Sequence, residues 1–146
     1  MTDRGGGERP QAPPRCWLGR VEIPAADPAR AARFYDHPLG WRARQTESGE
    51  TPYFDLLAPP GPADSGTGGE PRAGVTTAAV LGAVHPLAVI HVDGELAAVL
   101  ERVHAAGGST DLPPTPVPGH GTFARFRDPD GNLLGLWSPR DPSATD

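Results

Sequence analysis

Two charged residues stand two positions apart in the segment WLGRVEIPA, and their types could support proton transfer. Arg20 and Glu22 share one face if this segment forms a strand, because side chains alternate along a strand. A charged group on an inward face is costly unless it is paired, so the two residues could simply form an ion pair. Alternatively, Glu22 is a general base, its pKa raised by an apolar cleft or lowered by Arg20, and Arg20 stabilises developing negative charge.

Histidines supply the second set of candidates for acid–base chemistry. Alternate residues along HPLAVIHV would share one face of a second strand: His85, Leu87, Val89 and His91. His91 could transfer a proton, or it could be a core histidine whose hydrogen bonds are satisfied. His120 lies between two glycines in the loop PVPGHGTF, where we expect either contact with a ligand or plain exposure.

The segment RDPDGNLLGLW joins a turn signal to a short apolar strand that contains a glycine. Glycine weakens a strand interior and often marks a place where something approaches the backbone. Leu133, Gly135 and Trp137 alternate on one face, whereas Leu134 and Leu136 should face the helices as core. A glycine between bulky residues predicts an apolar slot for a flat or ring-bearing ligand.

The elements that would position these residues begin with the strand WLGRVEIPA. A helix over Pro28–Tyr35 follows, since Asp27 can accept hydrogen bonds from free first-turn amides and Pro28 occupies a position that needs no donor. Pro38 is expected to end this helix, because proline disfavours helical geometry in the residue before it. The remaining strands of this half are predicted after Leu39-Gly40-Trp41, over Pro52–Leu57 and over Val75–Leu81.

The second half repeats this order from Pro86. A strand leads to Asp93 as the cap of a helix over Gly94–Ala106, and the apolar residues of that helix recur at i, i+3, i+4 and i+7. Gly107-Gly108 should stop the helix, because glycine adopts the left-handed cap conformation freely. The later elements are a strand over Ser109–Leu112, a Pro-rich loop over Pro113–Gly119, and a hairpin of Thr122–Arg127 and Asn132–Trp137.

The two capping residues, Asp27 and Asp93, are 66 residues apart, and each stands between a strand and a helix. Two successive β-α-β-β-β units are a strong architectural signal and predict an α+β fold. We therefore expect a disordered tail over 1–15, a first module over 16–82 with a flexible loop over 58–74, a second module over 85–138, and a C-terminal tail over 139–146.

Composition narrows the classes of function. A chain of 146 residues suits one domain, and a net charge of −5 without a basic run argues against a nucleic-acid surface. No apolar run approaches the ~20 residues of a membrane span. The single cysteine, Cys16, fits a reducing cytosol. We expect a cytoplasmic protein with a small-molecule partner, no membrane partner and no nucleic acid.

The chain resembles the vicinal oxygen chelate superfamily, which includes glyoxalase I, bleomycin-resistance proteins, fosfomycin-resistance enzymes and extradiol dioxygenases. The likeness is carried by VEIPAADPARAARFYDHPLGW in the first half and by VIHVDGELAAVLERVHAAGG and FARFRDPDGNLLGLW in the second. It implies two βαβββ modules whose sheets curl into a half-barrel around a cleft, with the helices on the convex side. It also implies that alternate residues of the strands, those on one face of the sheet, line this cleft.

The resemblance places metal ligands of the metal-binding members at Arg20, Leu87 and Gly135, and within Val75–Leu81. None of these residues offers a metal-binding side chain, so no metal or cofactor is expected. Gly135 would stand where a ligand carboxylate is placed, leaving space in the cleft. A displaced set of Glu22, His85 and His91 is the rival, because two histidines and one carboxylate suit Fe(II) or Zn(II).

Two classes of function remain. The favoured one is a metal-independent enzyme of the lyase, isomerase or cyclase type that acts on a small organic metabolite in specialised metabolism, with Glu22, His91 and Arg20 as catalytic residues. The other is a protein that sequesters a drug or metabolite without changing it. The fold hosts both, and a homodimer is the expected assembly. The predicted substrate-binding residues are Leu87, Val89, Leu133, Gly135, Trp137, Trp41, His120 and Arg125.

Overall fold

The computed structural model describes residues 14–46, 52–58 and 73–140, and within them a single curled, unclosed sheet of eight strands. The predicted tail over 1–15 lies outside the described residues except at its end. The same holds for most of the predicted 58–74 loop and for the C-terminal tail after residue 140. None of the helices in the described ranges is long and apolar enough to cross a membrane.

Within the part of the chain that the structure describes, each half contains one main helix and four strands in the predicted order. The first module consists of β1 (Arg15–Pro24), α1 (Pro28–Leu39), β2 (Arg42–Thr46), β3 (Tyr53–Leu57) and β4 (Ala73–Thr76). The second consists of β5 (Leu87–Asp93), α3 (Leu96–Ala105), β6 (Ser109–Val117), β7 (Gly121–Arg127) and β8 (Leu133–Ser138). A short helix, α2 (Ala78–Leu81), lies between the modules.

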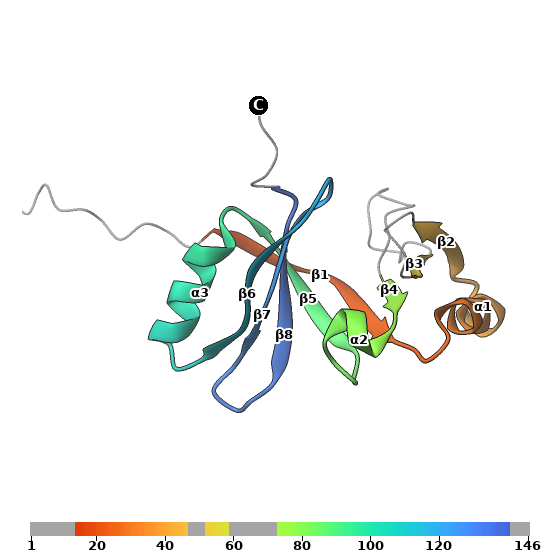
Figure 1. Cartoon of the computed structure of the whole chain (residues 1–146), viewed down its shortest axis with the longest axis horizontal. Coiled ribbons are helices and arrows are strands. Elements are labelled where there is room, and N and C mark those ends of the chain that lie inside the picture. The colour runs from red at the N-terminus through yellow and green to blue at the C-terminus, as the bar shows by residue number, and fades with distance from the viewer. Residues whose placement is uncertain (1–13, 47–51, 59–72, 141–146) are drawn as a thin grey trace, which may run out of the picture.

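The modules join through the middle of the sheet, whose strand order is β2-β3-β4-β1-β5-β8-β7-β6. Each module pairs its first strand with its last in parallel, β1 with β4 and β5 with β8, and the antiparallel pair β1–β5 connects the two halves. Figure 1 shows α1 and α3 far apart, one beside each half, with β1 and β5 running between them. The predicted α+β architecture of two βαβββ modules is confirmed.

Both main helices pack on one face of the sheet. The cluster beneath α3 consists of Val92, Leu96, Leu100, Ala124 and Leu136, and that beneath α1 of Ala32, Leu56, Ala73 and Val75. Leu136 therefore faces the helix, as predicted. Because strand side chains alternate, Arg20, Glu22, Val89 and His91 extend from the opposite face.

Helix α1 begins as predicted and ends later than predicted. Asp27 caps it, accepting a hydrogen bond from the backbone N–H of Arg30 at 3.2 Å. The prediction that Pro38 ends the helix was wrong, because α1 includes Pro38 and stops at Gly40. Gly40 adopts the left-handed conformation (φ 71°) and its N–H donates to the carbonyl of Asp36 at 2.8 Å. A proline in the last turn removes only one helical hydrogen bond, and the glycine cap completes the turn.

The predicted strand over Val75–Leu81 is a strand only at its first two residues. Strand β4 ends at Thr76, and Thr77 caps α2 by accepting a hydrogen bond from the N–H of Val80 at 3.3 Å. Gly82, with φ 77°, ends that helix in the left-handed conformation. Here local capping outweighs the β-branched composition that suggested a longer strand.

The second half departs from prediction at two places. Asp93 is the last residue of β5, and Glu95 precedes the first turn of α3 without a side-chain capping bond. Strand β6 continues through the prolines to Val117, where a loop was predicted. The sheet order leaves β6 at an edge, and an edge strand tolerates prolines because their missing N–H need not pair with a neighbour.

Arg125 ties the second module to the helix between the modules. Its Nη1 donates to the carbonyl of Leu81 at 3.1 Å, and its Nε donates to Asp111 at 2.8 Å. A Cβ on Gly82 would lie only 2.7 to 2.8 Å from the guanidinium, so the glycine leaves room for this contact. The position of α2 therefore depends on a side chain from β7.

We expect Arg125→Met to lower the free energy of unfolding by about 1.5–3 kcal/mol, because hydrogen bonds to a mostly buried charged group are lost. Chemical denaturation measures this change. Arg127→Met is the matched control, since the Arg127 side chain is 47% exposed and lies 3.7 Å from the same aspartate, so its loss should cost less than about 1 kcal/mol. Equal effects of both substitutions would show that Arg125 does not anchor α2.

Candidate functional site

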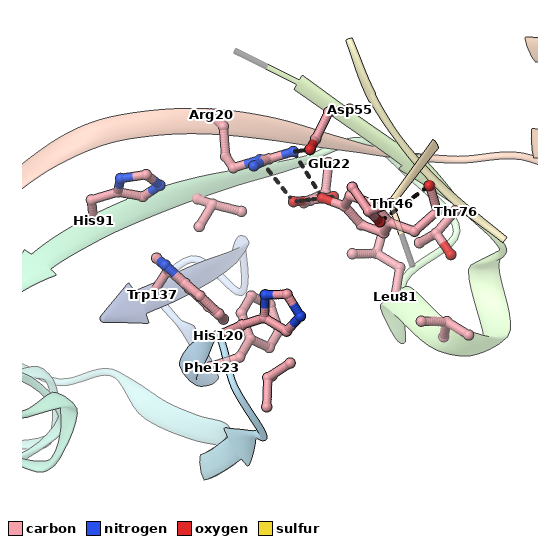
Figure 2. Close-up of a pocket in the computed structure, with 14 residues that line it drawn as sticks. Arg20, Glu22, Thr46, Asp55, Thr76, Leu81, His91, His120, Phe123 and Trp137 are labelled. Carbon is pink, nitrogen blue, oxygen red and sulfur yellow. Dashed lines mark hydrogen bonds and ion pairs between the residues drawn. The ribbon is translucent and has the colours of Figure 1, made fainter. Parts of the chain in front are cut away.

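A cavity of about 470 Å³ opens on the face of the sheet opposite α1 and α3. Both modules and α2 contribute to its walls. The described residues that line it are Arg20, Glu22, Thr46, Tyr53, Asp55, Thr76, Val80, Leu81, Val89, His91, Val117, His120, Phe123 and Trp137. Figure 2 shows Arg20, Glu22 and Asp55 on one side of this space and His120, Phe123 and Trp137 across from them.

The first module supplies a cluster of four polar side chains, which we call the polar wall: Arg20, Glu22, Tyr53 and Asp55. The Tyr53 hydroxyl is within 2.6 and 2.7 Å of the two Glu22 carboxylate oxygens, to which it donates. Arg20 Nη2 donates to the Tyr53 hydroxyl at 2.8 Å and to Asp55 Oδ1 at 2.9 Å. Arg20 Nε lies 3.0 Å from Glu22 Oε1, close enough for an ion pair but without hydrogen-bond geometry.

Glycine at position 74 lets the polar wall form across three strands. Strand β4 lies between β1 and β3, and Gly74 is the register partner of both Glu22 and Asp55. A Cβ on Gly74 would collide with the Tyr53 hydroxyl and would lie 2.6 Å from both Arg20 Nη2 and Glu22 Oε2. The missing side chain is therefore the space in which Tyr53, Arg20 and Glu22 meet.

Gly74→Ala is expected to lower the free energy of unfolding by about 1–3 kcal/mol, because the new methyl group forces the polar wall apart. The Tyr53→Phe background should reduce this loss, since it removes the oxygen atom nearest the added carbon. Chemical denaturation of the wild type, both single variants and the double variant gives the coupling energy.

Gly135→Ala is the control for this experiment, because Gly135 is also a buried strand glycine. Its added Cβ would lie 3.1 to 3.2 Å from ring atoms of Phe123 and from Val89 Cγ2, distances that small side-chain shifts can relieve. We expect a change within about 1 kcal/mol in either direction. An equally small effect of Gly74→Ala would contradict the role assigned to Gly74.

Burial dominates the electrostatics of the polar wall. Removal from water raises the pKa of Glu22, although Arg20 and the hydrogen bond from Tyr53 act in the opposite direction. Burial also raises the pKa of Tyr53, and the negative charge of Glu22 raises it further. Burial alone would lower the pKa of Arg20, but Glu22, Tyr53 and Asp55 together raise it, so the guanidinium stays charged.

The second module supplies a wall of rings and apolar side chains. Trp137 on β8 is the register partner of both His91 on β5 and Phe123 on β7, so the three side chains share one face. The ring of His91 lies over Gly19, where any Cβ would overlap it, and meets Trp17 edge-on with 5.9 Å between ring centroids. His120 belongs to the β6–β7 turn, and Figure 2 shows it beside Phe123.

Gly135 is buried, but it does not border the cavity. It lies between its register partners Val89 and Arg125, and the Phe123 ring and the Val89 side chain occupy the space where its side chain would be. The expected vacancy in the cleft is therefore filled by protein atoms. Phe123 approaches the backbone at this glycine, and it also lines the cavity.

The structure brings six of the predicted site residues to the cavity: Arg20, Glu22, Val89, His91, His120 and Trp137. Five others do not border it: Leu87, Leu133, Gly135, Trp41 and Arg125. Leu87 is 1% exposed and pairs with Glu22, Leu133 lies near the turn beside Arg127, and Arg125 is bound to Asp111 and α2. Trp41 stacks on Tyr35, with 6.1 Å between ring centroids, in the cluster beneath α1.

The sequence interpretation missed Tyr53 and Asp55 as members of the site. Their signal was available, since Tyr53 and Asp55 are two positions apart in YFDLL and share a strand face, and an acidic residue inside an apolar strand requires a partner. That partner, Arg20, is 35 residues away from Asp55 in sequence. Thr46, Thr76, Val80, Leu81 and Val117 carried no chemical signal of their own.

The polar wall does not fit a metal ion. Within residues 14–46, 52–58 and 73–140, no group of three or more His, Cys, Asp or Glu side chains is arranged to hold one. The displaced set of Glu22, His85 and His91 is accordingly not assembled. Arg20, a fixed cation, contacts the carboxylates of both Glu22 and Asp55 and lies where a metal ion bound to both would lie.

Sequence comparison connects residues 17–136 to the Glyoxalase/Bleomycin resistance protein/Dioxygenase superfamily, whose family pattern matches them. No sequence among the curated proteins matches the chain.

Several solved structures share the fold at low sequence identity. Methylmalonyl-CoA epimerase from Mycobacterium tuberculosis aligns with a TM-score of 0.54 at 17% identity, over 84% of this chain and 87% of its own. The Mn(II)-bound glyoxalase from Novosphingobium aromaticivorans aligns with a TM-score of 0.56 at 20% identity, over 88% of this chain and 41% of its own. The 2,2',3-trihydroxybiphenyl 1,2-dioxygenase from Sphingomonas wittichii strain RW1 aligns with a TM-score of 0.53 at 13% identity, over 85% of this chain and 42% of its own. Similarity at these identities describes the fold and leaves the chemistry open.

Proposed function

The chain belongs to the Glyoxalase/Bleomycin resistance protein/Dioxygenase superfamily, and on this premise we propose that it is a metal-independent enzyme that moves protons on a small, ring-bearing organic metabolite. Its structural neighbours include an epimerase, a glyoxalase and a dioxygenase, so membership alone does not select a reaction. The choice rests on the residues of this cavity.

One observation carries the proposal: a buried carboxylate, Glu22, borders the cavity and has a raised pKa. A general base works best when its pKa lies near the working pH, and burial raises the pKa of Glu22 in that direction. Tyr53 orients the carboxylate with its hydroxyl group, and Arg20 lies beside it as a fixed positive charge. Such an arrangement suits removal of a proton from a carbon atom next to a carbonyl group.

The histidines that border the cavity could complete the reaction. Glu22 would take the proton, the electron pair of the C–H bond would move into the carbonyl group, and a protonated imidazole would return a proton at another carbon or on the other face. His120 and His91 both border the cavity and are the candidates for this second step. Exchange with solvent would then remove the proton from Glu22 and restore that of the imidazole. Lyase, isomerase and cyclase reactions can each begin with such a proton transfer.

The proposal of metal independence follows from the donor set. The oxygen atoms that could bind a cation already surround Arg20, and no step needs a group that the chain does not supply. Metal analysis of the purified protein is the direct check. Stoichiometric Fe, Zn or Mn that is lost on Glu22→Gln would contradict this part of the proposal.

Proton exchange with solvent tests the chemistry without knowledge of the natural substrate. 2-Tetralone is an uncharged, ring-bearing ketone, and NMR in D2O detects deuterium entering the carbons beside its carbonyl group. We expect the protein to accelerate this exchange above the rate in buffer, and we expect Glu22→Gln to abolish the acceleration. Binding of 2-tetralone without any acceleration would favour the alternative below.

The alternative is a protein that sequesters a drug or metabolite without changing it. One observation favours it: the charges of the polar wall are paired with one another, and much of the remaining lining of the cavity is apolar, from Val80, Leu81, Val89, Val117, Phe123 and Trp137. Cytoplasmic location, a role in specialised metabolism and assembly as a homodimer remain proposals that accompany either function.

A further inference from the structure

We propose that the cavity selects uncharged, hydroxylated aromatic compounds and discriminates against both carboxylates and amines with the same ring. This inference deepens the proposed function and rests on it only in taking this cavity as the substrate site. It follows from how the charges of the polar wall are paired and from where the rings lie.

The charges that border the cavity are already matched within the polar wall. Among the described lining residues, the charged side chains are Arg20, Glu22 and Asp55. Arg20 contacts both carboxylates at 2.9 to 3.0 Å, and Asp55 has a second partner in Arg44 at 3.4 Å. Side-chain exposure of the three lining residues is between 10% and 17%, so water screens their charges only in part.

A ligand carboxylate would find no available cation on this wall. Arg20 Nη2 already donates to Tyr53 and Asp55, and Arg20 Nε faces Glu22. The charge of Arg20 is already balanced by Glu22 and Asp55, so a ligand carboxylate beside it would either add an unmatched negative charge or displace one of these residues as a buried, unpaired charge, and both are unfavourable. The negative charge of Glu22 would also repel the ligand at short range.

A ligand ammonium group meets the converse problem. Its natural partners would be Glu22 and Asp55, but the guanidinium of Arg20 lies between them and would repel it. Burying an ammonium group without a dedicated counterion is costly. Both signs of charge are therefore disfavoured at the same place in the cavity.

An uncharged hydroxyl group avoids both penalties. A carboxylate has about four acceptor positions, and the Tyr53 hydroxyl and Arg20 do not use all of them on Glu22. A ligand O–H can therefore donate to Glu22 without breaking the cluster. The ring that carries this hydroxyl would lie against Trp137 and Phe123 on the opposite wall, where flat aromatic surface is available.

Three naphthalene derivatives test this selectivity, because they share one ring system and differ in charge. At pH 7, 2-naphthol is neutral, 2-naphthoate is an anion and 2-naphthylmethylamine is a cation, as expected for phenol, carboxyl and amine groups. Ligand-observed NMR titration of the full chain gives the three dissociation constants. We expect 2-naphthol to bind at least tenfold more tightly than either charged probe.

Two variants show whether the selectivity arises as proposed. Glu22→Gln keeps the shape and the acceptor oxygen but removes the charge, so the ratio of 2-naphthoate to 2-naphthol dissociation constants should fall at least threefold. Phe123→Ala should weaken all three probes by similar factors, because it removes shared ring surface. Folding of each variant is checked by its thermal transition.

Several outcomes would overturn the inference. They are equal or tighter binding of 2-naphthoate or the amine, no binding of 2-naphthol, and a selectivity that Glu22→Gln leaves unchanged. These are binding measurements, so they are separate from the proton-exchange assay. Preserved selectivity without any exchange would overturn the proposed catalysis alone, and exchange without selectivity would overturn this inference alone.

Discussion

Arg20→Met is expected to lower the free energy of unfolding by about 3–5 kcal/mol at pH 7, because it leaves Glu22 and Asp55 as buried carboxylates without their shared cation. Arg20 is the only residue that contacts all three other members of the polar wall within the described ranges. Domains of this size are stable by about 5–15 kcal/mol, so the variant should be close to partial unfolding. Chemical denaturation of wild type and variant measures the difference.

Arg44→Met is the matched control for Arg20→Met. Arg44 also contacts Asp55, at 3.4 Å, but its side chain is 57% exposed, so its loss should cost less than about 1 kcal/mol. The loss in Arg20→Met should also shrink at acidic pH, because protonation of Glu22 removes one of the unpaired buried charges. A difference below about 1 kcal/mol at pH 7, or one that does not change with pH, would contradict the central role of Arg20.

Glu22→Gln is expected to lower the protein-catalysed proton exchange of 2-tetralone by at least about 100-fold, the usual range for loss of a positioned general base. Glutamine keeps the size of the side chain and an acceptor for the Tyr53 hydroxyl, so the cavity should stay intact. Exchange rates measured by NMR in D2O give the comparison. Glu101→Gln, the same change at an exposed position of α3, is the control and should leave the rate unchanged.

The pH dependence of the same exchange has a defined direction. Glu22 acts as a base only when it is ionised, so the rate should rise with pH through its raised pKa and then level off. Tyr53→Phe removes a hydrogen bond that favours the charged form, so the pKa of Glu22 rises further and the midpoint should move to higher pH. A midpoint that moves to lower pH would contradict the assigned hydrogen bond.

The stability of the protein reports on the same group independently of catalysis. The pKa of Glu22 in the folded state is raised above its unfolded value. Its favourable contribution to the free energy of unfolding is therefore complete below the unfolded pKa and is lost as the pH rises through the folded pKa. Glu22→Gln should remove this part of the pH dependence, and the variant should gain stability relative to the wild type toward neutral pH. Denaturation curves across that interval provide the test.

Much of the fold could be predicted because its signals are local. The alternation in WLGRVEIPA, the cap at Asp27 and the recurrence of the same order 66 residues later each lie within short segments. The errors at Pro38 and over Val75–Leu81 arose from local caps at Gly40 and Thr77, whereas another arose where partners from elsewhere in the chain decide. Pro113–Val117 is a strand because β7 pairs with one side of it while the other side is a sheet edge that tolerates proline.

The candidate site was predicted in part for the same reason. Alternation along β1 placed Arg20 and Glu22 on one face, and alternation along β8 turned Trp137 toward the cavity. Alternation could not show that Phe123 would occupy the space beside Gly135, since the two residues belong to different strands. Nor could it distinguish Trp41, which packs beneath α1, from an aromatic residue in the site.

The sequence by itself determined the repeated module, the faces of the strands and the charged pair on β1, because each depends on residues a few positions apart. The tertiary structure alone decided that Tyr53 and Asp55 join this pair, since they come from 33 and 35 residues beyond Arg20 and reach it over Gly74 of an intervening strand. Sheet pairing determines which distant side chains meet, and side chains that meet in a buried place change one another's charge and chemistry.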